Sequence, residues 1–243
     1  NGKTTTTYLV KAVLEQAGFK VGLIGTIKNL IGSQEIAAGH TTPEAADLQA
    51  LFAQMREAGV SHVVMEVSSH SLKFKRVDAC KFHIGAFTNL TQDHLDLHEN
   101  MENYKEAKAR LFSMLPDETG NFSIINIDDP YAKYFINAAG NHYTYGIKQQ
   151  ADVQASDLNI SLKGSQFRVN YNNDSFNISM ELIGLFSVYN ALAAIAFALE
   201  EGISPEVIKS ALEKVEGVPG RFEEVKGEHD FTVIVDYAHT PDG

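Results

Sequence analysis

The sequence predicts an α/β fold: three layers, with a mostly parallel sheet of the phosphate-loop type flanked by helices, and a small antiparallel subsheet attached. Short apolar runs alternate with helix-like segments from residue 3 to residue 127, which is typical of a parallel sheet. Gly2-Lys3-Thr4 stands at the start of the first helical pattern, and phosphate-binding loops end in this way. The segment 151–182 instead alternates polar and apolar residues, which indicates antiparallel strands.

Composition narrows the class of protein. The chain has 243 residues, with 20 Lys and Arg, 31 Asp and Glu, and one cysteine, Cys80. A single cysteine excludes a disulfide scaffold and a cysteine zinc site, and it suits a reducing, cytoplasmic compartment. The net charge of −11 argues against a nucleic-acid-binding protein, which usually presents a basic face. No apolar run approaches the roughly 20 residues that span a membrane, so membrane insertion is not expected.

The first elements follow from apolar spacing. Residues 3–18 are expected to be helical, because apolar side chains recur at helical intervals and Gly18 suits a helix end. The short apolar run 21–26 predicts a buried strand. Residues 43–58 predict a second helix with Pro43 in its first turn, where proline is favoured.

The central elements continue the alternation. Residues 62–67, 84–88 and 123–127 are short apolar runs, and each predicts a buried strand. A helix is expected at 101–115. Strands that alternate with helices in this way form a parallel sheet with helices on both faces.

The last part of the chain mixes a hairpin with helices. Residues 166–171 and 176–182 predict two antiparallel strands, because the turn-forming Asn172-Asn173-Asp174 separates them. Helices are expected again at 188–201 and 205–215, and a last strand at 231–236.

The start of the chain predicts a phosphate site. Gly2-Lys3-Thr4 is the end of the pattern G-x-x-x-x-G-K-[ST], in which backbone amides and the helix N-terminus bind phosphate. The lysine reaches the β- and γ-phosphates, and the threonine hydroxyl binds Mg²⁺. The alternative is an ordinary helix start capped by threonine. The run of four threonines argues against it, since β-branched residues form helices poorly.

Polar residues at two predicted strand ends form a second candidate group. Glu66 lies in an apolar run, and a buried carboxylate needs a cation such as Mg²⁺ or hydrogen bonds. Asp93 and His94 follow another strand, and ligands bind beyond the carboxyl ends of parallel strands. A purely structural, hydrogen-bonded Glu66 is the alternative. For Asp96 and His98, a solvated helix start is the favoured interpretation.

Lys108 falls on the apolar face of the helix at 101–115. It lies four residues after Tyr104, which begins a stripe of core-facing positions. Burial lowers the pKa of a lysine. Periodicity alone favours a stem that runs along the core with its amine at the surface. The alternative is that a neutral amine takes up CO₂ and becomes a carbamate able to bind metal.

Together these residues resemble the Mur ligases, and most closely the branch of that family that adds a diamino acid. The matching segments follow family order over nearly the whole chain. They are Asn1-Gly2-Lys3-Thr4-Thr5, Thr41-Thr42-Pro43, Glu66-Val67-Ser68-Ser69-His70, Thr88-Asn89-Leu90-Thr91-Gln92-Asp93-His94-Leu95-Asp96, Tyr104-Lys105-Glu106-Ala107-Lys108, Tyr189-Asn190-Ala191, Pro219-Gly220-Arg221-Phe222-Glu223 and Asp236-Tyr237-Ala238-His239-Thr240-Pro241-Asp242.

The resemblance implies an ATP-dependent ligase of bacterial cell-wall synthesis. ATP would phosphorylate the D-glutamate carboxylate of UDP-MurNAc-L-Ala-D-Glu, and a diamino acid, meso-diaminopimelate or L-lysine, would attack the acyl phosphate. It implies a cytoplasmic monomer with two Mg²⁺ sites and CO₂ held as a lysine carbamate. Residues 1–235 would be its central ATP-binding domain and 236–243 the start of a linker. The first half of the phosphate loop and two flanking domains would lie outside this sequence, and the isolated segment would fold but bind ATP weakly and form no amide.

The resemblance also implies roles for single residues. The phosphates would be held by Asn1, Gly2, Lys3, Thr4 and Thr5, and the rest of the nucleotide by Asn190, Arg221 and Asp236. The UDP-muramoyl dipeptide would be held by Thr41, Thr42, Ser68 and Arg76. One Mg²⁺ would be bound by Thr4 and Glu66, and the other by His94 and carbamylated Lys108; Lys3, His94 and Lys108 would be catalytic. Two departures are Phe74, where some relatives have glutamine, and Ser187, where asparagine is common.

Other functions fit parts of this pattern. A sister ligase, such as a folylpolyglutamate or cyanophycin synthetase, would share the nucleotide residues. A non-catalytic nucleotide-binding module would need neither Lys108 on a buried face nor the Glu66 and His94 pair. A phosphate-loop kinase is disfavoured, because no segment resembles a lid with clustered arginines.

Overall fold

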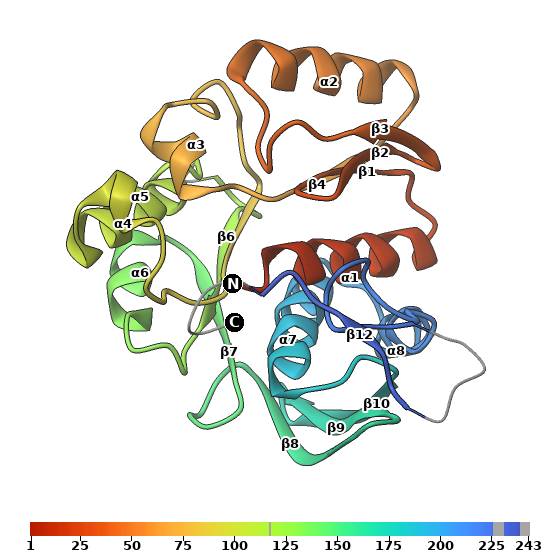
Figure 1. Cartoon of the computed structure of the whole chain (residues 1–243). Coiled ribbons are helices and arrows are strands. Elements are labelled where there is room, and N and C mark those ends of the chain that lie inside the picture. The colour runs from red at the N-terminus through yellow and green to blue at the C-terminus, as the bar shows by residue number, and fades with distance from the viewer. Residues whose placement is uncertain (117, 226–230, 239–243) are drawn as a thin grey trace.

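The computed structural model describes residues 1–116, 118–225 and 231–238 (Figure 1). Helix α1 (Lys3–Gln16) begins directly after Gly2 and packs against two later helices, α7 (Leu185–Glu200) and α8 (Pro205–Glu213). All three were predicted, and their ends differ from prediction by no more than a few residues. Residues 239–242 of the last sequence motif, and most of the predicted 236–243 linker, lie outside the described residues.

One sheet has four strands in the order β3-β2-β1-β4. Strands β1 (Val21–Ile24) and β4 (His62–Met65) pair in parallel, as predicted. Strands β2 (Lys28–Ile31) and β3 (Gln34–Ala37) form an antiparallel hairpin that the sequence did not predict. Helix α2 (Ala45–Glu57) covers this sheet. It begins after Glu44, so Pro43 precedes the helix and does not lie in its first turn.

The other main sheet has six strands in the order β10-β9-β8-β7-β6-β5. The bounds of its strands are β5 (Ile84–Phe87), β6 (Phe122–Asn126), β7 (His142–Gly146), β8 (Val153–Ser161), β9 (Gly164–Tyr171) and β10 (Asp174–Met180). Pairing from β5 to β8 is parallel, and pairing from β8 to β10 is antiparallel. The predicted antiparallel part therefore continues the parallel part in one sheet. Its hairpin turns at Asn172 and Asn173, both with positive φ.

Helices complete the layers on both faces of the six-stranded sheet. Helix α7 packs on β6, β7, β8 and β9, while α5 (Met101–Ser113) and α6 (Ala132–Ala138) share a separate core cluster with β5 and β6. Two short helices, α3 (Ser69–Lys73) and α4 (Leu95–His98), follow β4 and β5. A two-stranded sheet joins β11 (Glu223–Glu224) to β12 (Ile234–Val235), which is shorter than the predicted strand at 231–236. This arrangement confirms the predicted α/β class.

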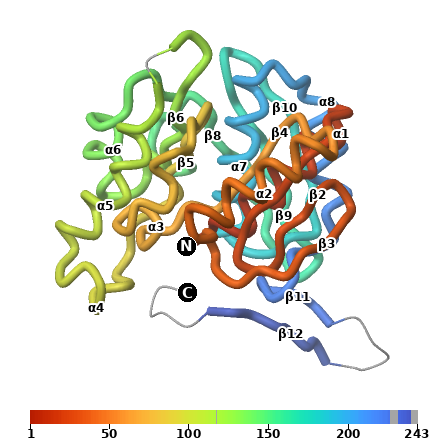
Figure 2. Tube along the Cα trace, turned by 90° about the horizontal axis from the view of Figure 1, so that it is seen from above, coloured from red at the N-terminus to blue at the C-terminus, as the bar shows by residue number. Residues whose placement is uncertain are grey.

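The β4 edge of one main sheet and the β5 edge of the other border a cavity of about 540 Å³. Its walls include every residue of β4 and most of β5, and α1 and α7 contribute apolar side chains. Within the described residues β4 pairs only with β1 and β5 only with β6, so each strand leaves one edge toward this cavity. Figure 2 shows β5, β6 and α3–α6 on one side and α1, α2 and β1–β4 on the other, with the N-terminus between them.

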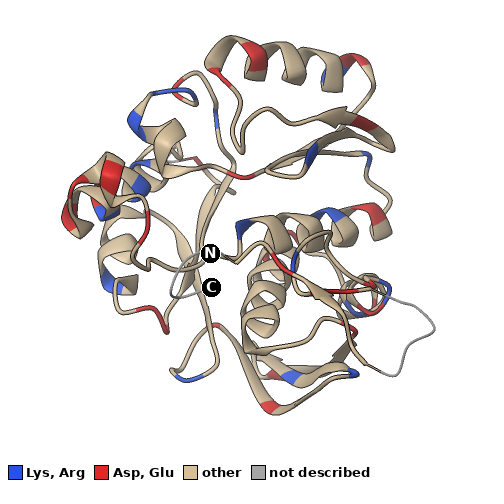
Figure 3. Cartoon of the chain, viewed as in Figure 1, with Lys and Arg blue, Asp and Glu red and all other residues tan. Residues whose placement is uncertain are grey.

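No helix in the described ranges is both long enough and apolar enough to cross a lipid bilayer. Lys and Arg are interspersed with Asp and Glu in the view of Figure 3. The net charge of the whole sequence is negative.

Candidate functional site

Polar side chains gather where α1 begins and where β1, β4 and β5 end. Glu66 follows β4 and is only 2% exposed. Its Oε2 accepts hydrogen bonds from Thr4 Oγ1 at 3.0 Å and Thr26 Oγ1 at 3.1 Å, and its Oε1 accepts one from Thr26 N at 2.9 Å. These bonds satisfy the carboxylate that the sequence placed in an apolar run. They also bring the Thr4 and Glu66 oxygens together, as the predicted Mg²⁺ site requires.

Gly2 allows the chain to enter α1 at this point. Its φ is +81°, a conformation that side chains disfavour, and a Cβ there would lie 2.3 Å from Asn190 Oδ1. Asn190, on α7, is buried and accepts a long hydrogen bond of 3.4 Å from Thr6 Oγ1. The predicted nucleotide residue Asn190 therefore lies against the first turn of α1, where Thr5 is also buried.

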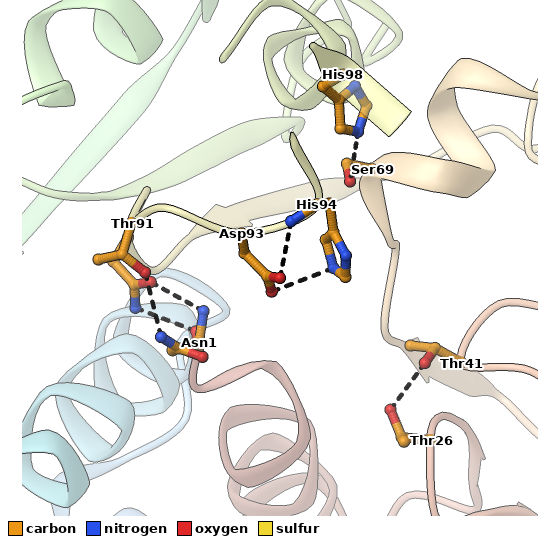
Figure 4. A network of polar contacts seen from close by, with 9 residues as sticks. Asn1, Thr26, Thr41, Ser69, Thr91, Asp93, His94 and His98 are labelled. Atoms are coloured by element: carbon orange, nitrogen blue, oxygen red, sulfur yellow. Dashed lines mark hydrogen bonds and ion pairs between the residues drawn. The ribbon is translucent and has the colours of Figure 1, made fainter. Parts of the chain in front are cut away.

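The residues after β5 hold the start of α1. The carbonyl oxygen of Asn1 accepts hydrogen bonds from Thr88 Oγ1 at 2.7 Å and Asn89 Nδ2 at 3.1 Å. The Asn1 side-chain amide donates to Thr91 Oγ1 at 3.2 Å (Figure 4). The sequence predicted no separate role for Thr88 and Asn89, and in the structure they position Asn1 in front of α1.

His94 ends the same loop, and its backbone has a left-handed conformation just before α4. It has φ +52°, and its N–H donates to Asp93 Oδ1 at 2.8 Å (Figure 4). Its Nε2 lies 3.3 Å from Asp93 Oδ2, and its ring contacts His70 edge-on at 4.7 Å between centroids. Burial lowers the pKa of His94, and the charges of Lys3 and Lys108 act in the same direction. A neutral imidazole is the form that binds metals.

Lys108 is half-buried. Burial, together with the charge of Lys3, lowers the pKa of its amine to about 7, while Asp93 and Asp129 oppose the shift. The amine lies 5.0 Å from the centroid of the Tyr104 ring, one helical turn earlier. A half-buried residue with a lowered pKa favours an inward amine over the surface position that periodicity favoured.

The apolar stripe predicted on α5 is partly right. Tyr104 and Phe112, which belong to the stripe, are buried. Ala109 lies off the stripe and is buried as well, whereas Ala107, which the helical spacing places on the stripe, is not fully buried. The stripe still places Lys108 toward the interior, with its amine under the electrostatic influence of Lys3 from α1.

Thr42 and Ser68 lie next to Glu66 but are occupied by local bonds. Thr42 is 1% exposed, and its hydroxyl donates to the backbone oxygen of Glu66 at 2.7 Å and accepts from Ser68 N at 3.1 Å. The Ser68 hydroxyl caps α3 by accepting from Ser71 N at 3.1 Å. In this structure Thr42 thus holds two loops together and offers no exposed hydroxyl to a ligand.

Arg76 and Thr41 complete the predicted substrate-binding group. Arg76 forms an ion pair of 2.6 Å with Glu44 and donates to the Thr42 backbone oxygen at 3.3 Å. Its buried Nε has no hydrogen-bond partner within the described residues. Thr41 shares a hydrogen bond of 3.0 Å with Thr26, which itself bonds Glu66 (Figure 4). The four predicted residues therefore reach Glu66 indirectly: Thr41 through Thr26, Thr42 through the Glu66 backbone, and Ser68 and Arg76 through Thr42.

Arg221 and Asp236 approach α1 from the end of the chain. Arg221 donates to Thr4 Oγ1 at 3.1 Å, and its guanidinium lies 5.0 Å from the Tyr237 ring. Asp236 accepts a hydrogen bond of 2.7 Å from the backbone N–H of Phe222. Asp236 therefore shapes the turn that directs Arg221 toward the start of α1.

Two residues of the site were not foreseen. His98 was expected in a solvated helix start, but it is 1% exposed and its Nε2 lies 2.9 Å from Ser69 Oγ (Figure 4). Asp96 is exposed in the first turn of α4, as expected. Buried Asp129 accepts hydrogen bonds from the backbone of Leu90 and Tyr131, and burial raises its pKa. Its only signal in the sequence was its place directly after a strand.

The donor set suits Mg²⁺ better than a transition metal. No group of three or more His, Cys, Asp or Glu side chains among the residues described is arranged to hold a metal by itself. Mg²⁺ keeps several waters and binds through one or two carboxylates together with substrate phosphates. The Thr4 and Glu66 oxygens, beside the helix N-terminus that carries Lys3, fit that mode of binding.

Known proteins share this sequence and fold. Residues 1–198 match the sequence profile of the Mur ligase middle domain. Over 244 residues the chain is 55% identical to a protein of Syntrophomonas wolfei named UDP-N-acetylmuramoyl-L-alanyl-D-glutamate--2,6-diaminopimelate ligase. It is 52% identical, over the same length, to the protein of that name from Caldanaerobacter subterraneus. Each alignment covers 100% of this chain and 50% of the relative.

A solved structure also resembles this chain in sequence and fold. A protein described as a UDP-N-acetylmuramoyl-L-alanyl-D-glutamate--2,6-diaminopimelate ligase superposes with a TM-score of 0.84 at 32% identity. The alignment covers 100% of this chain and 50% of that one. The chain thus spans about half the length of the relatives it matches.

Proposed function

Since the chain belongs to the Mur ligase family through its middle domain, we propose that it supplies the ATP site of a UDP-MurNAc-L-Ala-D-Glu:2,6-diaminopimelate ligase. The proposal rests on the convergence of two groups of residues. Thr4 and Glu66 share a hydrogen bond. Lys3, His94 and Lys108 influence one another electrostatically. The names of the relatives favour diaminopimelate as the diamino acid, over lysine or the substrates of sister ligases.

The start of α1 holds the ATP phosphates. Lys3 and the backbone amides of residues 1–5 donate to phosphate oxygens at the positive end of the helix. Thr4 and Glu66 would hold one Mg²⁺, and His94 and Lys108 a second; ions bound there would supply positive charge against the transferred phosphoryl group. Asn190, Arg221 and Asp236 line the nucleotide side. This arrangement is supported by the contact of Arg221 with Thr4 and of Asn190 with the first turn of α1.

Lys108 acts as a carbamate. An amine with a pKa of about 7 is largely neutral just above that pH, so its nitrogen lone pair can attack the carbon of CO₂. The nitrogen then loses one proton, and a carboxylate-like anion takes the place of the neutral amine. The nearby positive charge of Lys3, which disfavours the ammonium form, stabilises this anion.

The dipeptide substrate binds on the Thr41, Ser68 and Arg76 side of Glu66. Its D-glutamate carboxylate attacks the γ-phosphorus, ADP leaves, and an acyl phosphate forms. The amine of the diamino acid then attacks the acyl carbon, and phosphate leaves as the amide forms. Lys3 lies at the phosphates and offsets the repulsion between carboxylate and polyphosphate, which is the main barrier to the first step. Thr42 positions this side without contacting substrate.

The proposal also covers the organisation of the protein. Residues 1–235 act as the central ATP-binding domain of a longer cytoplasmic monomer whose other domains bind the UDP group and the diamino acid. The relatives, which are twice as long as the aligned region, support this. On this proposal the 243 residues alone bind ATP weakly and form no amide.

Nucleotide binding by the chain tests the proposal. Calorimetric titration with ATP and Mg²⁺ should show weak, magnesium-dependent binding that Lys3→Ala abolishes. Lys11→Ala is the matched control, because Lys11 lies two turns along the same helix in an exposed ion pair with Glu15. Equal binding by the Lys3→Ala and Lys11→Ala variants would refute the proposed site.

A further inference from the structure

His98 joins three elements of the site although no role was expected for it. Its Nε2 lies 2.9 Å from Ser69 Oγ, at the start of α3. Its ring stacks on Tyr104 of α5, with centroids 5.0 Å apart and an angle of 26° between the planes. It ends α4, where its own backbone N–H donates to the His94 oxygen at 3.0 Å. Its buried side chain thus joins its own segment after β5 to the segment after β4 and to the helix that carries Lys108.

The hydrogen bond to Ser69 has a defined direction. The Nδ1 of His98 is buried and has no partner among the described residues. A buried N–H without an acceptor is rarer than a buried acceptor without a donor, so the proton belongs on Nε2. His98 therefore donates to Ser69 Oγ. Burial lowers the pKa of His98, with Lys73 and the neighbouring histidines acting in the same direction.

The three contacts lie next to the groups of the proposed reaction. Ser69 directly follows Ser68, on the dipeptide side. His98 is one helical turn from His94. Tyr104 is one turn before Lys108, and its ring also contacts the Lys108 amine. We propose that His98 is a positioning residue that fixes the dipeptide-binding start of α3, the His94 loop and the Lys108 helix relative to one another. This inference rests on the proposed function.

Three substitutions separate the two contacts of His98. His98→Phe keeps a ring that stacks on Tyr104 but removes the hydrogen bond. His98→Gln keeps a donor at the position of Nε2 but removes the stacked ring. Ser69→Ala removes the hydrogen bond from the other side with little change in volume. His142→Phe and His142→Gln are matched controls, because His142 is an exposed histidine at the start of β7.

Hydrogen–deuterium exchange of residues 66–74 and 92–99 in the 243-residue chain is the first measurement. His98→Phe and Ser69→Ala should each speed exchange in both segments by about fivefold, the effect of losing one hydrogen bond. His98→Gln should keep wild-type exchange in residues 66–74. Faster exchange in 92–99 alone, or equal effects of Phe and Gln, would overturn the inference. If His98→Phe fails to fold, Ser69→Ala still decides.

Metal-dependent nucleotide binding is the second measurement. With Mn²⁺ as a paramagnetic substitute for Mg²⁺, His98→Phe should weaken binding of ATP and Mn²⁺ by about tenfold, and the His142 variants should not. Unchanged affinity would show that His98 does not position the metal-binding groups. If the wild-type chain does not bind ATP and Mn²⁺ at all, the proposed function fails, while the exchange measurement still tests the coupling of the two segments.

Discussion

Thr4 and Glu66 lie 62 residues apart in the sequence, yet their side chains share a hydrogen bond of 3.0 Å. The bond joins the first turn of α1 to the end of β4. A hydroxyl and a carboxylate held together beside a helix N-terminus are oxygen ligands of the kind that Mg²⁺ takes in phosphate sites. The same carboxylate accepts hydrogen bonds from Thr4 and Thr26, so its buried oxygens are not left without partners.

Glu66→Gln should separate the structural role of this residue from metal binding. A glutamine can accept from Thr26 N and donate to the two hydroxyls, so the fold should persist. It lacks the negative charge that Mg²⁺ needs. Binding of ATP in Mg²⁺ should fall about tenfold or more, to its level in EDTA. Calorimetry with and without Mg²⁺ measures this, with exposed Glu57→Gln as control. Retained magnesium dependence would leave Glu66 a purely structural residue.

Lys108→Met should stabilise the chain in a pH-dependent way. The pKa of Lys108 falls from 10.5 to about 7 in the folded chain. Between these values the unfolded chain binds a proton that the folded chain does not, so the stability of the wild type rises with pH over this window. The gain from Lys108→Met should therefore be largest at pH 6 and shrink toward pH 10.

Urea unfolding in CO₂-free buffer at pH 6 and pH 10 measures the difference. Lys209→Met, at an exposed position on α8, should show no such trend. An equal gain from Lys108→Met at both pH values would mean that the amine reaches water and titrates normally.

Carbamate formation at Lys108 has its own spectroscopic signature. In ¹³C-labelled bicarbonate at pH 8 the amine is mostly neutral, and the chain should show one slowly exchanging carbamate carbon resonance. Lys108→Arg should remove this resonance, because a guanidinium does not take up CO₂ under these conditions. A resonance that survives in the Lys108→Arg variant belongs to another amine. None in the wild type at saturating bicarbonate would count against the carbamate.

Gly2→Ala should damage the entry to α1. A Cβ at this position would lie 2.3 Å from Asn190 Oδ1, and φ is +81°. Strain of about 1–3 kcal/mol is typical of such a backbone position, and the Asn190 amide would also have to move. We expect a lower urea midpoint and loss of ATP binding. Gly140→Ala, which has open space around it, is the control. Matching behaviour of the two variants would show that α1 begins in another way.

Much of the fold was predictable because strong local signals coincide with buried elements. Strand β6 is wholly buried and most of helix α7 is buried, and both segments are rich in apolar residues. The hairpin of β2 and β3 was missed, because β3 is mostly exposed and carries no apolar alternation. Helices α3 and α6 are only 5 and 7 residues long, too short for helical periodicity to stand out.

The site was predictable at the level of residue types and not of contacts. Glu66 and Lys108 stood out because a charge in an apolar pattern needs a partner or a changed pKa. Nothing in the local sequence showed that the Thr42 hydroxyl turns inward or that His98 is buried, because both depend on elements brought together only by folding. Asp129 was missed for the same reason: its partner Leu90 lies 39 residues away.

The ligation reaction itself tests the central proposal most directly. The complete gene product that carries these residues would be incubated with ATP, Mg²⁺, UDP-MurNAc-L-Ala-D-Glu and 2,6-diaminopimelate, and products would be identified by mass. The account predicts a UDP-MurNAc-tripeptide formed with one ADP per amide, and loss of both products in Lys3→Ala. A folded protein that binds ATP but makes no tripeptide, or that ligates glutamate to folate instead, would contradict it.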